Sequence, residues 1–510
     1  MTKYPQEYKK IQEMVLGYIA NTKLDPFPVV FEVVSSDEMS SIASYTGFPR
    51  RYPHWRFGME YERNHNMNKY GFQQIYEMVI NNNPAYAYLL EGSEISTIKT
   101  VMAHVYGHSD FFKNNYMFKN TNRNMLNKMG DNASIIRKII DVHGLEKVES
   151  FIDSCLMIEN LIDANYTFQP PKRNDKAPIF EEQETAQEIP RFKAKDYMQP
   201  FINPPEFLEA QKKRIDEAQK KEKEKVPGPE KNIMLFLLEN APLEPWEQKI
   251  LAIIMEEAYY FLPQRQTKIM NEGWATYWHS KLMTEYLLRP ENMLQKDELI
   301  SYLDQHSKII QQDRKNINPY RLGLDLFRYV EHCWNTGRHG KEYEECDNLE
   351  RKQRWNTNEG KGLEKIFIVR SCYNDIMFID EFFTPEFAAE QNYFMHIDDS
   401  STDERFIFSR DFAVIKETML NQLTNLGLPL IYIVDSNFKN RNELQLYHKW
   451  TGIPLRRDFA VTTLKSIARI WKRPVNIETV EIEKEKEKRI RIIADGEEVK
   501  RETGTSTQFI

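Results

Sequence analysis

Apolar residues recur at helical spacing over two long parts of the chain. The first predicted helix lies within residues 4–21, where apolar side chains stand three or four positions apart at Ile11, Met14, Val15, Tyr18 and Ile19. This spacing gives an amphipathic helix with one buried stripe. Helical patterning continues to about Ala164, returns at Ile233 and runs to about Trp334. We expect the second helical region to pack against the first.

Proline and charge interrupt the helical pattern between these two regions. Prolines recur throughout residues 169–230, together with the charge run QKKRIDEAQKKEKEK. Because proline ends helices and the stretch holds few apolar residues, the sequence predicts an excursion or linker at 169–231. One exposed helix near 206–225 is compatible with the pattern.

Short apolar runs rich in β-branched and aromatic residues follow Gly362. KIFIVR, IMFID, RFIFS and LPLIYIVD predict strands, with a helix near 412–425 between the last two. Polar and apolar residues then alternate around Asp495-Gly496, which predicts a hairpin. We therefore predict an α+β fold, in which a predominantly helical N-terminal unit precedes a smaller α/β or α+β C-terminal domain.

The length of 510 residues is typical of about three domains. The predicted parts are an N-terminal helical region at 1–168, the excursion at 169–231, a second helical region at 232–356 that completes the first, and a C-terminal domain at 357–510. A glycine total of only 19 also favours a helix-rich architecture.

Composition excludes several classes of partner and compartment. Lys and Arg total 69 against 76 Asp and Glu, so no broad cationic field favours nucleic acid. The four cysteines stand far apart, which is typical of a reducing compartment. No apolar run is long enough to span a bilayer, and no apolar stretch follows the first residues. We predict a cytoplasmic protein without a membrane span.

Two histidines four residues apart are the first candidate for chemistry. On a helix, His104 and His108 lie on one face and can chelate one metal ion. Gly107 between them costs about 1 kcal/mol relative to Ala, which is tolerable where another segment approaches closely. Two structural histidines with satisfied hydrogen bonds are the alternative.

A second candidate helix carries Glu272 and His279, which are seven residues apart and nearly eclipsed. An unpaired carboxylate buried on this largely apolar face would cost several kcal/mol, so a metal ion or a basic partner must compensate it. The alternative is an ion pair with Arg265 or Lys268 and a structural imidazole.

Together, His104, His108 and Glu272 make a set of two histidines and one glutamate. Such a set leaves a fourth position open, as in catalytic zinc sites. Val105 stands where an H-E-x-x-H site has its general-base glutamate. Candidates for the missing catalytic base are Glu256, Glu257 and His279, and His306 is a further candidate ligand.

Polar and aromatic residues also cluster in YPHWRFG and NNNPAYAY. They predict either a polar-lined pocket or an internal hydrogen-bond network. Candidates for substrate or oxyanion contacts are Asn81, Asn83, Tyr86 and Tyr277. Arg370, Asn374 and Asp375 lie in IFIVRSCYND, and Asp435 follows the predicted strand LPLIYIV. Polar residues just past a strand end often bind ligands in α/β sheets, but we favour capped turns at these positions.

Several long motifs, in the same order, resemble the SpoVR family (stage V sporulation protein R). They are YPHWRFG (52–58), YEMVINNNPAYAYLLE (76–91), VMAHVYGHSDFFKNN (101–115), TKIMNEGWATYWHSKLM (267–283) and NPYRLGLDLF (318–327). The segments EKIFIVRSCYNDIMFIDEF, NRNELQLYHKWTG and IWKRPVNIET resemble the C-terminal domain of the family. The resemblance covers nearly the whole chain except 170–230.

The SpoVR resemblance implies a role in spore cortex formation, or in stress-related envelope biogenesis where relatives do not sporulate. It also implies two partners encoded nearby, a serine protein kinase and a von Willebrand-type domain protein. A weaker resemblance, to gluzincin-type metallopeptidases, implies a helical metal site with His104, His108 and Glu272 as zinc ligands. Val105 departs from that pattern and puts peptidase activity in doubt.

Two hypotheses of different classes follow. The first is a zinc-dependent hydrolase-like protein of envelope or cortex biogenesis. The second is a non-enzymatic cytoplasmic regulatory or scaffold protein that acts with the kinase. Complementation with a folded His104/Glu272 double variant would discriminate between them, and the metal content of the purified protein would test the proposed ligands.

Overall fold

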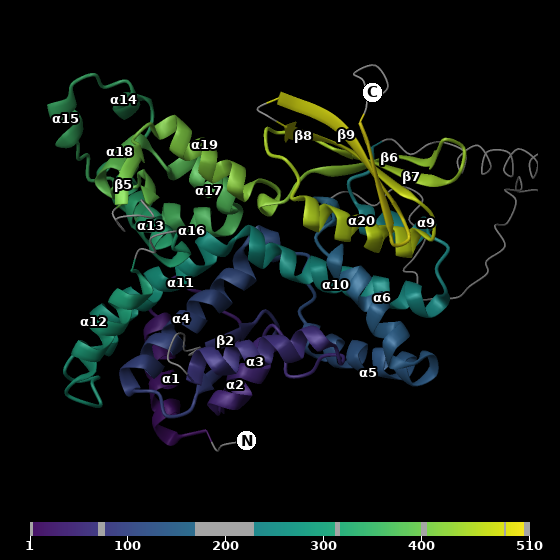
Figure 1. Ribbon diagram of the computed structural model, residues 1–510. Helices are drawn as coiled ribbons and strands as arrows, with labels where there is room; N and C mark the ends of the chain where they lie inside the picture. The colour runs from purple at the N-terminus through teal and green to yellow at the C-terminus, as the bar shows by residue number, and fades with distance from the viewer. Residues whose placement is uncertain are drawn as a thin grey trace, which may run out of the picture. The chain divides into compact units, whose positions relative to one another are not determined.

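The computed structural model describes residues 4–69, 77–168, 229–311, 317–398, 405–483 and 486–503. The chain divides into two compact units (Figure 1). Unit 1 comprises Met1–Ser150 and Glu256–Leu428, and unit 2 comprises Phe151–Met255 and Pro429–Ile510. Residues from both predicted helical regions thus enter unit 1, as do residues 357–428. The predicted excursion lies outside the described residues from 169 to 228.

Unit 1 is mostly helical. Its helices are α1 (Gln6–Ile19), α2 (Ser36–Ser44), α3 (Trp55–Lys69), α4 (Ile95–Asn114), α5 (Met125–His143), α11 (Lys268–Leu282), α12 (Glu298–Ile309), α13 (Pro319–Thr336), α14 (Lys341–Glu344), α15 (Leu349–Gln353), α16 (Gly362–Cys372), α17 (Asp375–Phe382), α18 (Pro385–Glu390) and α19 (Phe412–Leu423), with the short helical turns η1 (Tyr116–Phe118), η4 (Met283–Leu287) and η5 (Thr424–Gly427). Two further helices, α6 (Leu145–Met157) and α10 (Pro245–Gln266), contribute residues to both units. The predicted first helix is confirmed, because α1 buries Tyr8, Ile11, Val15 and Ile19.

Glycines allow three helices of unit 1 to pack closely. A Cβ atom added at Gly107 of α4 would lie 2.7 Å from the Cα of Ala275 in α11. A Cβ added at Gly273 of α11 would lie 2.4 Å from the Cα of Gly323 in α13. Both separations are far below van der Waals contact, so no larger residue fits. The close approach predicted at Gly107 is confirmed, and the second helical region does pack on the first.

A small sheet precedes α4, although the sequence pattern indicated only helix there. Its strands are β1 (Val29–Val34), β2 (Glu77–Ile80) and β3 (Ala85–Leu90), in the order β1-β3-β2. β1 pairs with β3 in parallel, and β2 pairs with β3 antiparallel. The sequence analysis did not predict these strands, because such short apolar runs have no distinguishing period.

Two of the predicted C-terminal strands are helices. KIFIVR lies in α16 and IMFID lies in α17, so these two strand predictions were wrong. Asn374 begins α17, since its side chain accepts a hydrogen bond from the backbone N–H of Met377 at 3.0 Å. RFIFS forms β5 (Arg405–Ser409), which pairs with β4 (Met395–Asp398), and the predicted helix near 412–425 is α19. Exposed positions of these helices also carry apolar side chains, Ile368 in α16 and Met377 in α17, so the apolar runs show no helical period.

Unit 2 contains a five-stranded sheet in the order β10-β9-β8-β7-β6. Its elements are α9 (Ile233–Asn240), β6 (Ile431–Phe438), β7 (Glu443–His448), α20 (Arg457–Trp471), β8 (Val475–Glu483), β9 (Lys486–Asp495) and β10 (Glu498–Thr503), with the turn η2 (Tyr166–Phe168). β7 and β8 are parallel and α20 connects them, packed against the sheet (Figure 1). The predicted hairpin is confirmed, because β9 and β10 pair across Asp495 and Glu498. The α+β class is confirmed as well.

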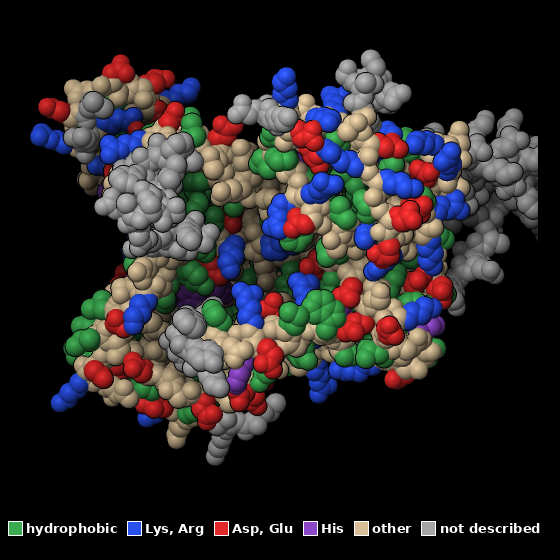
Figure 2. Space-filling model, viewed as in Figure 1, with side chains coloured by type: hydrophobic (Ala, Val, Ile, Leu, Met, Phe, Trp, Pro, Cys, Tyr) green, Lys and Arg blue, Asp and Glu red, His purple; other side chains and the backbone are tan. Residues whose placement is uncertain are grey.

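Charged side chains of both signs are intermixed on the face shown in Figure 2. Figure 2 shows Lys and Arg interspersed with Asp and Glu on the visible face. This mixture agrees with the near balance of 69 basic and 76 acidic residues.

Candidate metal centre

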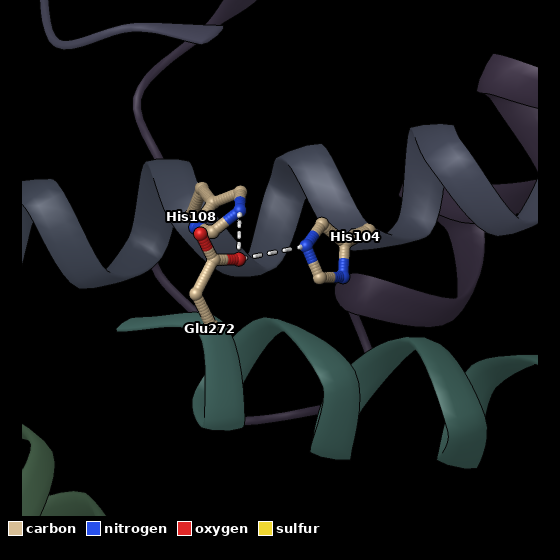
Figure 3. A group of neighbouring side chains, drawn as sticks. All are labelled: His104, His108 and Glu272. Atoms are coloured by element: carbon tan, nitrogen blue, oxygen red, sulfur yellow. Dashed lines mark ion pairs between the residues drawn. The ribbon is translucent and has the colours of Figure 1, made fainter. Parts of the chain in front are cut away.

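Three side chains from two neighbouring helices of unit 1 converge on one point. His104 and His108 come from α4, and Glu272 comes from α11 (Figure 3). The Oε2 atom of Glu272 lies 3.5 Å from Nε2 of His104 and 3.4 Å from Nε2 of His108. One donor atom from each residue lies within 4.8 Å of the other two. The structure thus brings together the three side chains that the sequence offered as candidate ligands.

These distances fit the edges of a zinc coordination tetrahedron. Zinc bonds of about 2.0–2.2 Å to nitrogen and oxygen place neighbouring ligand atoms about 3.4 Å apart. The Glu272 Oε2 atom is also buried without a hydrogen-bond partner. Its neighbours are the two imidazole nitrogens, at distances longer than a usual hydrogen bond, and a cation bound between the three atoms would contact all of them.

The other ring nitrogen of His108 is fixed by the residue that precedes Glu272. His108 Nδ1 lies 2.9 Å from Oδ1 of Asn271, an atom that only accepts hydrogen bonds. The Nδ1 atom therefore carries a proton. In the neutral form of the ring, the lone pair is on Nε2, the nitrogen that faces the carboxylate at 3.4 Å and that would bind a metal ion.

A chain of histidines extends from His104. Its Nδ1 atom lies 2.9 Å from Nδ1 of His279, and Nε2 of His279 lies 3.0 Å from Nδ1 of His306 in α12. The ring of Tyr320 stacks on His104 with centroids 6.0 Å apart. His306 is thus not grouped with the three candidate ligands, but lies two hydrogen bonds behind one of them.

The surroundings of the site set the charges of its members. Burial would raise the pKa of Glu272, but the facing His108 and His104 outweigh burial and lower that pKa well below its usual range. Burial, together with the neighbouring His104 and His306, lowers the pKa of His279 far below its usual value. Glu272 is therefore an anion and His279 is a neutral imidazole near pH 7.

A carboxylate from another helix holds the start of α11. Asp375, at the beginning of α17, accepts hydrogen bonds from the backbone N–H groups of Ile269 at 2.8 Å and Met270 at 2.9 Å. Burial raises the pKa of Asp375 to about 7, although these bonds oppose the shift. This contact satisfies free N–H groups at the helix start and fixes α11 two residues before Glu272.

Buried ion pairs hold α4 in place on both sides of the histidines. Asp110 accepts a hydrogen bond from Nε1 of Trp274 at 2.9 Å and lies 3.2 Å from Nη1 of Arg370. Near the other end of α4, Nζ of Lys99 lies 2.6 Å from Oε2 of Glu298. Removing one member of such a pair leaves a buried charge, which is strongly destabilising. Arg370, predicted as a ligand-binding candidate, therefore joins α16 to α4.

The three candidates for the catalytic base lie in different environments. Glu256 pairs with Lys128 at 3.6 Å, and the buried Glu257 pairs with Arg51 at 2.6 Å. His279 is completely buried, and both of its ring nitrogens face other imidazoles. Only His279 contacts a member of the candidate centre.

The candidates for substrate contacts are engaged within unit 1. Asn81 is buried, accepts a hydrogen bond from Arg123 and donates one to Thr121 at 3.2 Å. Tyr277 is also buried and donates a hydrogen bond to Glu331 at 2.7 Å. For these two residues the structure favours the internal network that the sequence left open.

Asn83 and Tyr86 follow Asn81 in the segment that leads from β2 to β3. The side chain of Asn83 is exposed, and its backbone N–H donates to the carbonyl of Arg123 at 2.9 Å. Tyr86 lies on β3, opposite Ile80 of β2 and Val30 of β1. Asn83 thus lies in the connection between β2 and β3, and Tyr86 lies within β3.

Sequence reasoning missed the partners of the two histidines. Asn271 and Tyr320 contact His108 and His104, yet neither was singled out as part of the site. The only signal was the position of Asn271, directly before Glu272. The contact between Asn271 and His108 could not be predicted from the residues near Asn271, because His108 lies in a distant segment of the chain.

Two family models cover most of the chain. The model described as SpoVR like protein matches residues 3–428. The chain belongs to the SpoVR family. A second model, the SpoVR-like C-terminal domain, matches residues 429–482 of this SpoVR-family protein. The border between the two matches coincides with the division between units 1 and 2 at Leu428 and Pro429.

A curated relative extends over nearly the same length. The SpoVR-family chain is 31% identical over 470 residues to "Uncharacterized protein YcgB" of Escherichia coli (strain K12), which covers 88% of this chain and 87% of the relative. No solved structure matches the chain. In the part of the SpoVR-family chain that the structure describes, no helix combines the length and apolarity needed to cross a membrane.

Proposed function

We propose that this SpoVR-family protein binds a zinc ion through His104, His108 and Glu272 and uses it as a hydrolytic centre. The observation that carries the proposal is the convergence of two imidazole nitrogens on a buried carboxylate oxygen that has no hydrogen-bond donor. Three protein ligands leave a position for substrate, as in catalytic rather than structural zinc sites.

The chemistry would be divided between the ion and the chain. When bound, a zinc ion in such a set acts as a Lewis acid that activates water and polarises a carbonyl group. The residues of the chain hold the ligands in place, and Glu272 supplies the negative charge that offsets part of the ionic charge. Lys268, which is largely exposed, lies 3.8 Å from Oε1 of Glu272 and is a cation at the edge of the site.

The helix that carries the histidines lacks the usual base of metallopeptidases. Val105 is completely buried, so this position offers neither a carboxylate nor access to substrate. The proposal is therefore hydrolysis in a general sense, on a substrate of spore cortex or envelope biogenesis. Membership of the SpoVR family supports the pathway in this proposal, and the arrangement of His104, His108 and Glu272 supports the type of reaction.

Elemental analysis tests the metal. Protein purified without chelator should contain about one zinc per chain, because three ligands and an open position bind zinc well. His104→Ala should lose that zinc, whereas His332→Ala, which removes an exposed histidine of α13, should retain it. An equal zinc content in the two variants, or none in the unaltered protein, would contradict the proposed site.

The internal bonding of the predicted substrate residues favours a second candidate function. Asn81 and Tyr277 are occupied within the fold, and Val105 removes the usual base. We therefore keep a non-enzymatic regulatory or scaffold role beside a serine protein kinase and a von Willebrand-type domain protein as the alternative. A His104→Ala/Glu272→Ala double variant that folds and still restores sporulation in a deletion strain would favour this alternative.

A further inference from the structure

We propose that Asn271 and His279 are positioning residues that hold the two histidines as Nε2 ligands. The inference rests on the proposed zinc site and deepens it. Each histidine presents Nε2 to the candidate centre and Nδ1 to one of these two residues, both of which come from α11. The helix that supplies the third ligand therefore also supplies the partners that orient the first two.

The Asn271 contact allows only one proton position on His108. Its Oδ1 atom accepts, so Nδ1 of His108 must donate. A neutral imidazole carries one proton, and Nε2 is then left with its lone pair directed at the centre. Asn271 is adjacent to Glu272. The same turn of α11 therefore carries the candidate ligand Glu272 and the residue that orients His108.

The His279 contact allows two directions of hydrogen bonding. In the first, Nδ1 of His104 donates to His279, and Nε2 of His279 donates to His306. This direction leaves Nε2 of His104 without a proton, which is the form that binds a metal ion. In the second direction, Nδ1 of His306 donates to Nε2 of His279, and Nδ1 of His279 donates to Nδ1 of His104. The proton of His104 is then on Nε2, which donates toward Glu272.

A bound cation selects the first direction, because a protonated Nε2 cannot be a ligand. The structure places a hydrogen-bond partner for His104 at this point, since the completely buried His279 holds its Nδ1 atom 2.9 Å from Nδ1 of His104. Without that partner, the Nδ1–H of His104 would be left unsatisfied next to the centre. The ring would then lose its fixed orientation.

Zinc affinity of paired variants tests the inference in the full-length protein. Asn271→Leu and His279→Leu remove the acceptor, while Asn271→Asp and His279→Gln keep one. Loss of an outer partner typically lowers metal affinity 10–100-fold, and we expect that loss in the Leu variants. The Asp and Gln variants should recover most of it. The measurement is zinc(II) competition against a chromophoric chelator, with cobalt(II) absorbance as a second probe of ligand geometry.

A control separates positioning from general damage to the fold. Asn132→Leu replaces another buried asparagine of unit 1, in α5, and should leave zinc affinity unchanged. Thermal unfolding of the zinc-free proteins identifies variants that fail to fold, and Asn271→Ala and His279→Ala then replace the larger Leu substitutions.

The outcomes distinguish the inference from the proposed function. Unaltered zinc affinity in the Leu variants would overturn the positioning role, as would Asp and Gln variants that bind as poorly as the Leu variants. Absence of zinc from the unaltered protein would instead contradict the proposed site itself, before any variant is compared.

Discussion

Glu272 is the residue on which the candidate centre depends. Among the described residues, it is the carboxylate that both histidines face, and its side chain is only 13% exposed. The facing imidazoles lower its pKa although burial opposes the shift. At the residue scale, the site is therefore a buried carboxylate anion with two imidazole nitrogens directed at one of its oxygens.

Asp375 provides a pH-dependent test at the residue scale. Its pKa is about 7 in the folded protein, above the ordinary value of 3.8. Between these values the folded protein holds a proton that the unfolded chain releases, so the contribution of Asp375 to stability falls as pH rises. Asp375→Asn cannot titrate. We expect the free energy of unfolding of the unaltered protein, relative to this variant, to fall by about 3 kcal/mol between about pH 5 and about pH 8.

Urea denaturation of both proteins at the two pH values measures this difference. The variant also loses one backbone acceptor, but that loss is the same at both pH values and cancels from the comparison. A difference that stays constant, or that rises with pH, would contradict the raised pKa.

At the element scale, the close packing of α4, α11 and α13 decides where the ligands meet. Gly107 and Gly273 lie in the two ligand-bearing helices, each next to a candidate ligand in sequence. Without side chains at these positions, the helix backbones approach closely enough for His104 and His108 to face Glu272. A wider separation would move the histidines away from the carboxylate.

Gly107→Ala should therefore destabilise unit 1. The added Cβ would lie 2.7 Å from the backbone of Ala275, and overpacking of this kind costs about 1–3 kcal/mol. Gly130→Ala is the matched control, because nothing lies within 4 Å of its added Cβ in α5. That variant should be stabilised by up to about 1 kcal/mol through helix propensity. Chemical denaturation measures the free energy of unfolding of both variants. Equal values for the two variants would show that α4 and α11 can move apart without cost.

At the scale of the whole molecule, all three candidate ligands lie in unit 1. They come from the two chain segments of that unit, which are separated in sequence by the segment assigned to unit 2. A metal ion would thus link two distant parts of the chain within one compact unit. Metal binding is then expected to stabilise unit 1 directly.

Zinc removal should lower the stability of unit 1. Zinc at about 100 times its dissociation constant would add about 2.7 kcal/mol by mass action. Hydrogen exchange of the unaltered protein should show α4 and α11 less protected after chelation, and protection should return with added zinc. His104→Ala should show no response to either treatment. A zinc response of the same size in that variant would mean that the ion binds elsewhere.

The sequence by itself determined the features that depend on neighbouring residues. The i, i+4 spacing of His104 and His108 places them on one helix face whatever surrounds the helix. The alternation around Asp495-Gly496 likewise specified the β9–β10 hairpin, and the apolar spacing of residues 4–21 specified α1. Several long motifs, in the same order along the chain, also indicated the SpoVR family. These features are local, and the spacing of residues along the chain is enough to predict them.

Only the tertiary structure decided the features that depend on packing between distant segments. It placed Glu272 between the two histidines, gave Asn271 and His279 their positioning contacts, and occupied Asn81 and Tyr277 within the fold. It also made KIFIVR and IMFID helical, because short, continuously apolar runs carry no period that separates helix from strand. The donor atoms of the candidate centre belong to helices far apart in the chain, and only their close packing brings those atoms to one point.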